Sequence, residues 1–252
     1  MINGINYEHS YLTSGGFGDI YISEHSQAVK KIDKNNLNIF KKEVEMSLIL
    51  RNCVNIVKIR KSFAYKGNGY LLMDLCDMDL LHFLKTRETL SEREIASYFL
   101  QICKAIKEIH SMGVSHLDLK LENILLSNNQ IKLADFGSAT KFKRKEKKIL
   151  RRRAGTHLYV APELLKQEPI LPSKADIWSL GIILHVLAVR CFPVFDPLYD
   201  CTSSNFTLCH LNDSDVSVPL KRLISKILKI SPQDRCSLDN ILYHPWLIKN
   251  AI

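Results

Sequence analysis

Four polar side chains in the stretch 116–137 have the chemistry that a site for metal and phosphate needs. Asp135 and Asn123 offer oxygen atoms, the ligands that Mg²⁺ prefers while it keeps several of its waters. Asp118 can accept the proton of an attacking hydroxyl group, and Lys120 can neutralise charge on a phosphoryl group in transfer. The stretch therefore predicts a site for phosphoryl transfer.

Two short elements joined by a tight turn must hold these side chains. The apolar run Ile124–Leu126 follows Asn123, and the polar segment 127–130 makes the turn. The alternating segment 131–134 then reads as a short strand that ends directly before Asp135.

The motifs in this stretch resemble those of eukaryotic protein kinases. The sequence reads H-L-D-L-K-L-E-N over 116–123, and D-F-G follows at 135–137. This pair resembles the catalytic and magnesium-binding loops of the family, and a lysine two residues after the aspartate is typical of its serine/threonine branch. The resemblance covers roughly residues 7–248. It implies transfer of the γ-phosphoryl group of ATP to protein Ser or Thr hydroxyls, with Mg²⁺ or with Mn²⁺ in its place.

The same resemblance implies an α+β, two-lobed protein kinase fold, with 1–252 as a single catalytic domain. A small antiparallel-sheet N-lobe with one key helix would span about 1–73, the hinge about 74–79, and a larger, mainly helical C-lobe about 80–252. The 252 residues suit one large domain or two small lobes. Contents of 46% apolar and 24% charged residues are ordinary for a globular protein.

Cysteine usage and the N-terminus favour an intracellular protein, cytoplasmic or nuclear. The seven cysteines are odd in number and include no C-x-x-C pair, as expected of free thiols in a reducing compartment. No charged-then-apolar signal segment opens the chain. The apolar run Ile177–Val189 has about 13 residues, whereas a spanning helix needs roughly 20. We therefore expect a core helix there and no membrane association.

The positive charge of the chain is concentrated in one run. Residues 141–153 hold nine Lys or Arg and one Glu, a net of +8 out of a total of +9, so about +1 remains for the rest. Three interpretations stay open: a solvated surface loop, recognition of acidic peptide substrates, and a nuclear-targeting or nucleic-acid patch. Phe142 is the only aromatic residue of the run, which argues against stacking on nucleic-acid bases.

Residues 7–32 read as three short strands. The first ends at Tyr11-Leu12, the second spans 19–22 and the third spans 28–32. The glycines between the first two let the backbone approach phosphates closely, although a glycine hairpin turn without a ligand has the same pattern. The segment resembles the glycine-rich kinase loop, with Thr13 in place of its first glycine. The resemblance implies a nucleotide site that includes Leu12, Gly15, Gly16, Gly18, Ile20, Ala28 and Leu125.

Ala28-Val29-Lys30 resembles the end of the kinase V-A-I-K strand, which implies that Lys30 binds the α- and β-phosphates. Lys31 points to the opposite face of such a strand. Residues 37–51 have helical apolar spacing and correspond to the helix whose glutamate pairs with this lysine. Glu43 and Glu45 are both candidates, and the spacing to Asn55-Ile56-Val57 favours Glu45.

The strand Tyr70–Met73 and the residues after it resemble the hinge between kinase lobes. On this resemblance Met73 lies beside the adenine, and backbone groups of Asp74 and Cys76 hydrogen-bond the base. Asp79 can reach the ribose. Without a nucleotide, Cys76 reads as a small buried apolar residue.

The catalytic loop departs from the family at Leu117, where most protein kinases have an arginine that pairs with a phosphorylated residue. Leucine cannot hold a phosphate. Ser138, Thr140 and Thr156 are the only hydroxyl residues between Asp135 and Tyr159. We therefore hypothesise that activity does not require phosphorylation of this segment.

Residues 155–163 read G-T-H-L-Y-V-A-P-E and resemble the kinase segment that docks the peptide. The resemblance implies that Thr156 bonds Asp118 and Lys120, and that Glu163 forms a buried ion pair with Arg235. The motif D-I-W-S-L-G, which starts at Asp176, implies that this aspartate holds the backbone of the catalytic loop.

Two further segments read as amphipathic helices. Ser91-Glu92-Arg93-Glu94 is a capping box that opens the first, and apolar residues from Leu220 to Leu228 form the second. His244, in H-P-W, reads as structural.

Three rival functions have weaker support in the sequence. A pseudokinase that acts as an ATP-binding scaffold has Thr13 and Leu117 as its support, but Lys30, Asp118 and Asp135 are all present. The peptide-docking segment argues against a kinase of small molecules or lipids, and a nucleic-acid binder needs no metal motifs. We expect a monomer that acts on protein substrates, acidic ones if the basic run contacts them.

Overall fold

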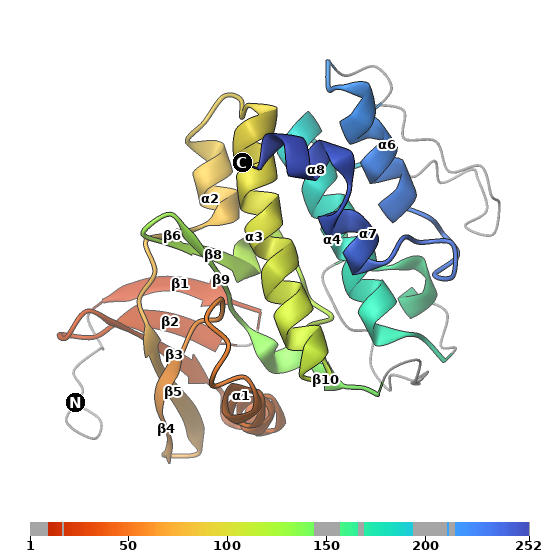
Figure 1. Ribbon diagram of the computed structural model, residues 1–252. Helices are drawn as coiled ribbons and strands as arrows, with labels where there is room; N and C mark the ends of the chain where they lie inside the picture. Colours follow the sequence, from red (N-terminus) through yellow and green to blue (C-terminus); the bar gives the residue numbers. More distant parts are fainter. Residues whose placement is uncertain are drawn as a thin grey trace.

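The computed structural model describes residues 10–16, 18–143, 157–165, 169–193, 211 and 215–251. It has a sheet-rich N-lobe and a helical C-lobe (Figure 1), the expected two-lobed α+β fold. Thr156 and the basic run from residue 144 onward lie outside the described residues.

The N-lobe is built on a five-stranded antiparallel sheet of order β1-β2-β3-β5-β4. The first strand does not end at Leu12 as expected. It continues to Gly15, which pairs with Gly18, so the glycines form the hairpin turn itself. A Cβ atom at Gly18 would lie 2.1 Å from the Lys31 carbonyl oxygen, so this close approach requires glycine. The strands are β1 (Tyr11–Gly15), β2 (Gly18–Ile22), β3 (Gln27–Ile32), β4 (Ile59–Tyr65) and β5 (Asn68–Asp74).

One helix, α1 (Leu37–Ile49), packs against this sheet, after the short helix η1 (Lys34–Asn36). Its buried residues are Ile39, Glu43 and Met46, which follow the spacing of i, i+4 and i+7 on one helix face. A glutamate therefore lies in the middle of the face that α1 turns toward the protein.

The C-lobe begins with β6 (Met78–Asp79) and α2 (Leu80–Lys85), and then the long helix α3 (Glu92–Ser111). The predicted capping box is confirmed, because the Glu94 amide donates to the Ser91 hydroxyl and the Glu94 carboxylate accepts from the Ser91 amide. Such a cap contributes about 1 kcal/mol to a helix.

Short elements that follow α3, up to Lys141, position the residues that the sequence singled out. Two small sheets form, one of order β6-β8-β9 and one that pairs β10 with β7. The elements are β7 (Val114–Ser115), η2 (Leu121–Asn123), β8 (Ile124–Ser127), β9 (Gln130–Leu133), η3 (Phe136–Ser138) and β10 (Thr140–Lys141).

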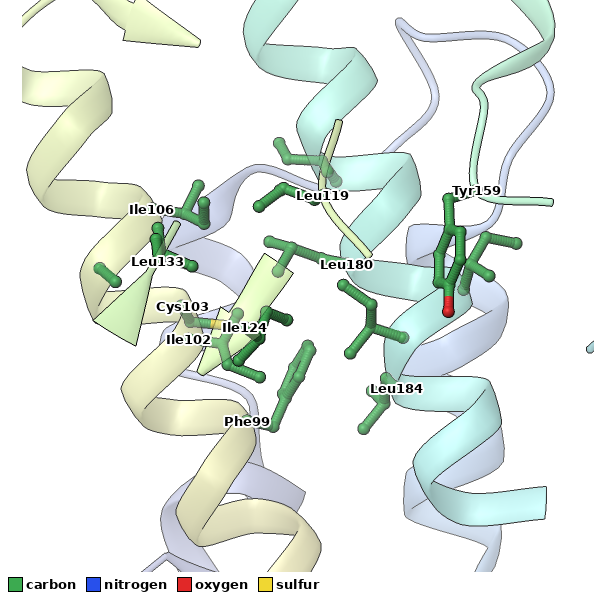
Figure 2. Close-up of a cluster of buried hydrophobic side chains, with 14 of the residues drawn as sticks. Phe99, Ile102, Cys103, Ile106, Leu119, Ile124, Leu133, Tyr159, Leu180 and Leu184 are labelled. Atoms are coloured by element: carbon green, nitrogen blue, oxygen red, sulfur yellow. The ribbon is translucent and has the colours of Figure 1, made fainter. Parts of the chain in front are cut away.

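The core of the C-lobe lies where α3 packs against α4 (Pro172–Val189). Figure 2 shows Phe99 and Ile102 of α3 pointing toward Leu180 and Leu184 of α4, and all four side chains are buried. Each such side chain contributes roughly 1.5–3 kcal/mol when it is fully removed from water. By length and composition alone α4 could cross a membrane, but 78% of it is buried in the fold, as expected of a core helix. The remaining elements among the described residues are η4 (Pro162–Leu165), α6 (Val218–Ile227), α7 (Leu238–Leu242) and α8 (Pro245–Asn250).

A buried ion pair joins two distant parts of this lobe. Both terminal nitrogens of Arg235 lie 2.6 Å from the two carboxylate oxygens of Glu163, which confirms the predicted pairing. The guanidinium also donates to the carbonyls of Lys174 and Lys229 and lies 4.9 Å from the ring centroid of Trp178. His244, interpreted as structural, caps α8 by accepting from the Trp246 amide at 3.4 Å.

Candidate active site

Lys30 pairs with Glu43, and the expectation of Glu45 is wrong. The Lys30 ammonium lies 2.7 Å from a Glu43 carboxylate oxygen, and each side chain is 4% exposed. Glu45 forms an exposed ion pair with Lys141 instead. Two residues along an α-helix correspond to a rotation of about 200°, so the two glutamates point to nearly opposite sides of α1. The i, i+4, i+7 spacing of Glu43 with Ile39 and Met46 was the sequence signal for the correct residue.

Asp135 is a second acidic partner of Lys30. Its carboxylate lies 3.1 Å from the ammonium. One cation thus faces a buried carboxylate, that of Glu43, and a largely buried one, that of Asp135. For Lys30, burial alone would lower the pKa, but attraction to Glu43 and Asp135 outweighs burial and raises it. For Asp135, burial would raise the pKa, but Lys30 holds it below its ordinary value.

The ionised form of Glu43 is less stabilised than that of Asp135. Burial raises the pKa of Glu43 to about 7, Lys30 opposes the shift, and the charge of Asp135 adds to it. The site therefore has a charged lysine, an ionised Asp135 and a glutamate that titrates near neutral pH.

The catalytic loop holds Asp118 between a lysine and an amide. The Lys120 ammonium lies 3.1 Å from a carboxylate oxygen of Asp118. The Asn123 side-chain nitrogen donates to the Asp118 carbonyl at 2.8 Å and to its carboxylate at 3.2 Å. The backbone N–H of Asp118 donates to the His116 ring at 3.3 Å. Three of the residues that the sequence singled out thus meet within one loop.

Asp176 holds the backbone of this loop through hydrogen bonds, as the resemblance implied. Its carboxylate accepts from the backbone amides of His116 at 2.9 Å and Leu117 at 2.8 Å, and from the Ser115 hydroxyl at 2.7 Å. The His110 ring lies 2.7 Å from the same carboxylate. Leu117 is buried and has a φ of +63°, a strained conformation for a leucine that these hydrogen bonds support.

Asn123 and Asp135 fit a small divalent cation. Because the Asn123 nitrogen is engaged with Asp118, its side-chain oxygen is the atom left to act as a ligand. Asp135 adopts φ +61° and keeps its pKa low, so it is ionised at neutral pH. Within the described part of the chain, no cluster of three or more His, Cys, Asp or Glu could hold a metal. Two oxygen ligands suit a hard cation that retains waters.

The strand register gathers the predicted nucleotide residues on one face of the N-lobe sheet. Ile20 pairs with Lys30, and Ala28 pairs with Met73. Directly paired residues share a face, as do residues two apart on a strand, so Ile20, Ala28, Lys30 and Met73 lie on the same side. Lys31 lies on the other side, as expected. Leu12 is exposed at a register irregularity of β1, with Gly15 and Gly16 after it.

The hinge residues are partly engaged with other groups. The Asp74 carboxylate binds Arg60 through two hydrogen bonds of 2.6 and 3.0 Å, and the Asp74 amide donates to the Lys58 carbonyl at 3.1 Å. Asp79 caps α2 by accepting from the His82 amide at 2.7 Å, and it pairs with Leu125 of β8. Burial raises the pKa of the half-buried Cys76 thiol to about 11, and Asp74 and Asp77 add to the shift.

A contact between the lobes was missed at the sequence level. The Asn55 side chain donates to the Ile131 carbonyl at 3.1 Å, and the backbones of Asn55 and Val57 bond to Leu133 at 2.8 and 2.9 Å. These bonds tie the loop after α1 to the strand before Asp135. They join residues more than 70 positions apart in the sequence, and no local sequence pattern predicts such a pairing.

The fold and the paired metal and phosphate motifs are those of a protein kinase. The chain belongs to the protein kinase family, since the family model described as "Protein kinase domain" matches residues 8–247. The family implies the use of ATP and a divalent metal.

Curated relatives support this assignment. The chain is 34% identical to CBL-interacting serine/threonine-protein kinase 5 of Arabidopsis thaliana, over 95% of this chain and 57% of that protein. It is 33% identical to CBL-interacting protein kinase 5 of Oryza sativa subsp. japonica, over 94% and 54%. It is 31% identical to serine/threonine-protein kinase PLK4 of Drosophila virilis, over 96% and 33%. The chain thus spans between a third and somewhat over half of the length of these relatives.

Proposed function

We propose that this protein transfers the γ-phosphoryl group of ATP to serine or threonine hydroxyls of proteins, with Mg²⁺ as the metal. The observation that carries the proposal is the arrangement of five groups in two sets: Lys30 faces Asp135, and Lys120 and Asn123 both contact Asp118. Each of these positions holds the side chain that phosphoryl transfer needs there.

The roles follow from charge and position. Asp118 accepts the proton of the attacking hydroxyl, and Lys120 stabilises negative charge on the phosphoryl group. Lys30, held by Glu43, binds the nucleotide phosphates. Asn123 and Asp135 would hold the metal, which supplies charge neutralisation on the phosphates when bound. Catalysis in this scheme is mostly positioning and electrostatic stabilisation.

We also propose that activity does not require phosphorylation of the segment after Asp135. Leu117 is buried and carries no charge with which to bind a phosphate, and Glu43 is already paired with Lys30 in the unmodified chain. Phosphatase treatment, followed by mass spectrometry and an activity assay, tests this point. A phosphate in the segment whose removal abolishes activity would refute it.

We further propose a substrate class, an oligomeric state and a cellular location for this protein. The run 141–153 would attract acidic peptides, the protein would act as a monomer, and it would reside inside cells. Buried free thiols at Cys53 and Cys103 support a reducing compartment. Gel filtration tests the oligomeric state, and fractionation tests the location.

The deciding experiment is transfer of radiolabelled phosphate from ATP-Mg²⁺ to an arrayed peptide library. Asp135→Ala should abolish incorporation, whereas Asp239→Ala, a matched change at an exposed aspartate, should not. The preferred peptides give the substrate motif at the same time. If the parent chain transfers no phosphate but ATP still raises its melting temperature, the protein is an ATP-binding pseudokinase.

A further inference from the structure

The strand β10 is a fixed part of the C-lobe. Lys141 pairs with Val114 of β7, and the Phe142 amide donates to the Gly113 carbonyl at 2.8 Å. The Phe142 ring packs edge-on against His110, with centroids 5.7 Å apart. Gly113 has a φ of +70°, and a Cβ atom there would lie 2.9 Å from the Phe142 carbonyl oxygen. The backbone that carries Lys141 is therefore well anchored.

Helix α1 contacts this anchored strand through an ion pair between Glu45 and Lys141. The two side chains are 52% and 55% exposed, so the pair lies at the surface. On the opposite side of the same helix, Glu43 reaches Lys30 and shares it with Asp135. The helix that carries the buried glutamate is thus attached to the C-lobe by a charge on its outer side.

We propose that Glu45 and Lys141 are positioning residues that couple the start of the activation segment, residues 135–143, to α1 and thereby keep Glu43 on Lys30. The inference rests on the proposed function and adds a mode of regulation to it. Both charges belong to unmodified side chains, the Glu45 carboxylate and the Lys141 ammonium, so the coupling needs no phosphate. A variant, ligand or salt that breaks the pair would loosen α1 and weaken binding of the nucleotide phosphates.

The size of the effect is bounded by exposure. An ion pair at the surface supports a change of about two- to five-fold in an equilibrium, and less as salt screens it. We therefore expect Glu45→Gln and Lys141→Gln each to lower kcat/KM for ATP about two- to five-fold at low ionic strength. The double variant should lose no more than either single one, because both remove the same contact.

The charge swap distinguishes the pair from its individual side chains. Glu45→Lys combined with Lys141→Glu should recover most of the parent kcat/KM, whereas each single reversal should be worse than the neutral variant. The control is the exposed pair Lys107–Asp239, with an atom separation of 2.8 Å and exposed fractions of 51% and 65%. Lys107→Gln and Asp239→Asn should leave kcat/KM unchanged.

Hydrogen exchange supplies a readout that does not depend on activity. Amides of residues 39–49 in α1 should exchange faster in Glu45→Gln than in the parent, and parent-like exchange should return in the swapped pair. If neither exchange nor kcat/KM changes in Glu45→Gln, the inference is wrong even if the protein is a kinase. A parent chain without phosphoryl transfer would instead refute the proposed function, and the exchange result would still decide on the coupling.

Discussion

Glu43 and Lys30 form an ion pair of 2.7 Å in which neither side chain is exposed by more than 4%. We predict that Glu43→Gln lowers kcat/KM for ATP about ten- to hundred-fold, because a hydrogen bond to a charged group contributes about 1.5–3 kcal/mol. Lys30 keeps Asp135 as a partner in the variant, so some activity should remain. Steady-state kinetics at saturating peptide measures the effect.

The matched control for this change is Glu45→Gln, which makes the same substitution two residues along α1. Its loss should stay within about five-fold, because its partner Lys141 is exposed to solvent. If Glu45→Gln proved the more damaging variant, the assignment of the two glutamates would have to be reversed.

Activity should depend on pH near neutrality through Glu43. Because its pKa lies at about 7, lowering the pH from 8 to 6 protonates it and weakens its hold on Lys30. We predict that kcat/KM for ATP falls over this range in the parent, more than in Glu43→Gln, which has no carboxylate to titrate. Comparison of the two profiles removes the titration of ATP itself. Parallel profiles would contradict this prediction.

The same raised pKa acts on stability with the opposite sign. An unfolded glutamate titrates near its ordinary value of 4.5, whereas Glu43 in the folded chain titrates at about 7. Between these values the folded state binds the extra proton, so the contribution of Glu43 to stability decreases as the pH rises from 4.5 to 7. The parent should therefore lose stability relative to Glu43→Gln across this window, as thermal denaturation can measure.

Short-range patterns were sufficient for much of this site. The loop 116–123 and the strand before Asp135 could be predicted because motif and local alternation agree. Lys30 could be chosen over Lys31 because a strand has a period of two. Glu43 and Glu45 were both candidates, and the spacing to Asn55-Ile56-Val57 favoured the wrong one, because that spacing does not reflect the helical face formed by Ile39, Glu43 and Met46.

Contacts between distant segments could not be predicted in the same way. The pairing of Lys141 with Val114 depends on packing within the C-lobe, and the bonds between Asn55 and Leu133 depend on how the two lobes pack together. The continuation of β1 to Gly15 depends on the hairpin register, which a glycine-rich segment specifies weakly.

Arg235 should be required for stability. Arg235→Leu leaves the largely buried Glu163 without its partner, and breaking a buried pair on one side costs about 3–5 kcal/mol. For a chain of this size the melting temperature should fall by about 6–20 °C. Differential scanning fluorimetry measures the loss. Arg222→Leu on α6 is a matched substitution at an arginine outside this pair and should change the melting temperature by far less. Equal melting temperatures for Arg235→Leu and the parent would count against the pair.

Asp176→Asn should impair both folding and catalysis. Burial alone would raise the pKa of Asp176, but hydrogen bonds from His110, Ser115 and the Leu117 amide hold it below its ordinary value of 3.8. An asparagine retains one acceptor oxygen and turns an amide group toward these donors. The backbone of Leu117, at φ +63°, then loses support, and Asp118 next to it moves out of position.

We expect Asp176→Asn to cost about 3–5 kcal/mol at neutral pH, as loss of a buried charge with several hydrogen bonds does. Because the pKa of Asp176 is lowered by folding, its ionised carboxylate stabilises the folded state. This stabilisation is fully present above pH 3.8, the ordinary pKa, and is lost as the pH falls through the pKa of the folded state. The gap between parent and variant in urea denaturation should therefore be constant from pH 8 to 5 and narrow only below pH 4. Ser115→Ala, which removes a single donor to the same charged carboxylate, should cost less, about 1.5–3 kcal/mol. A variant with parental stability and a parental kcat would show that the loop holds its shape without Asp176.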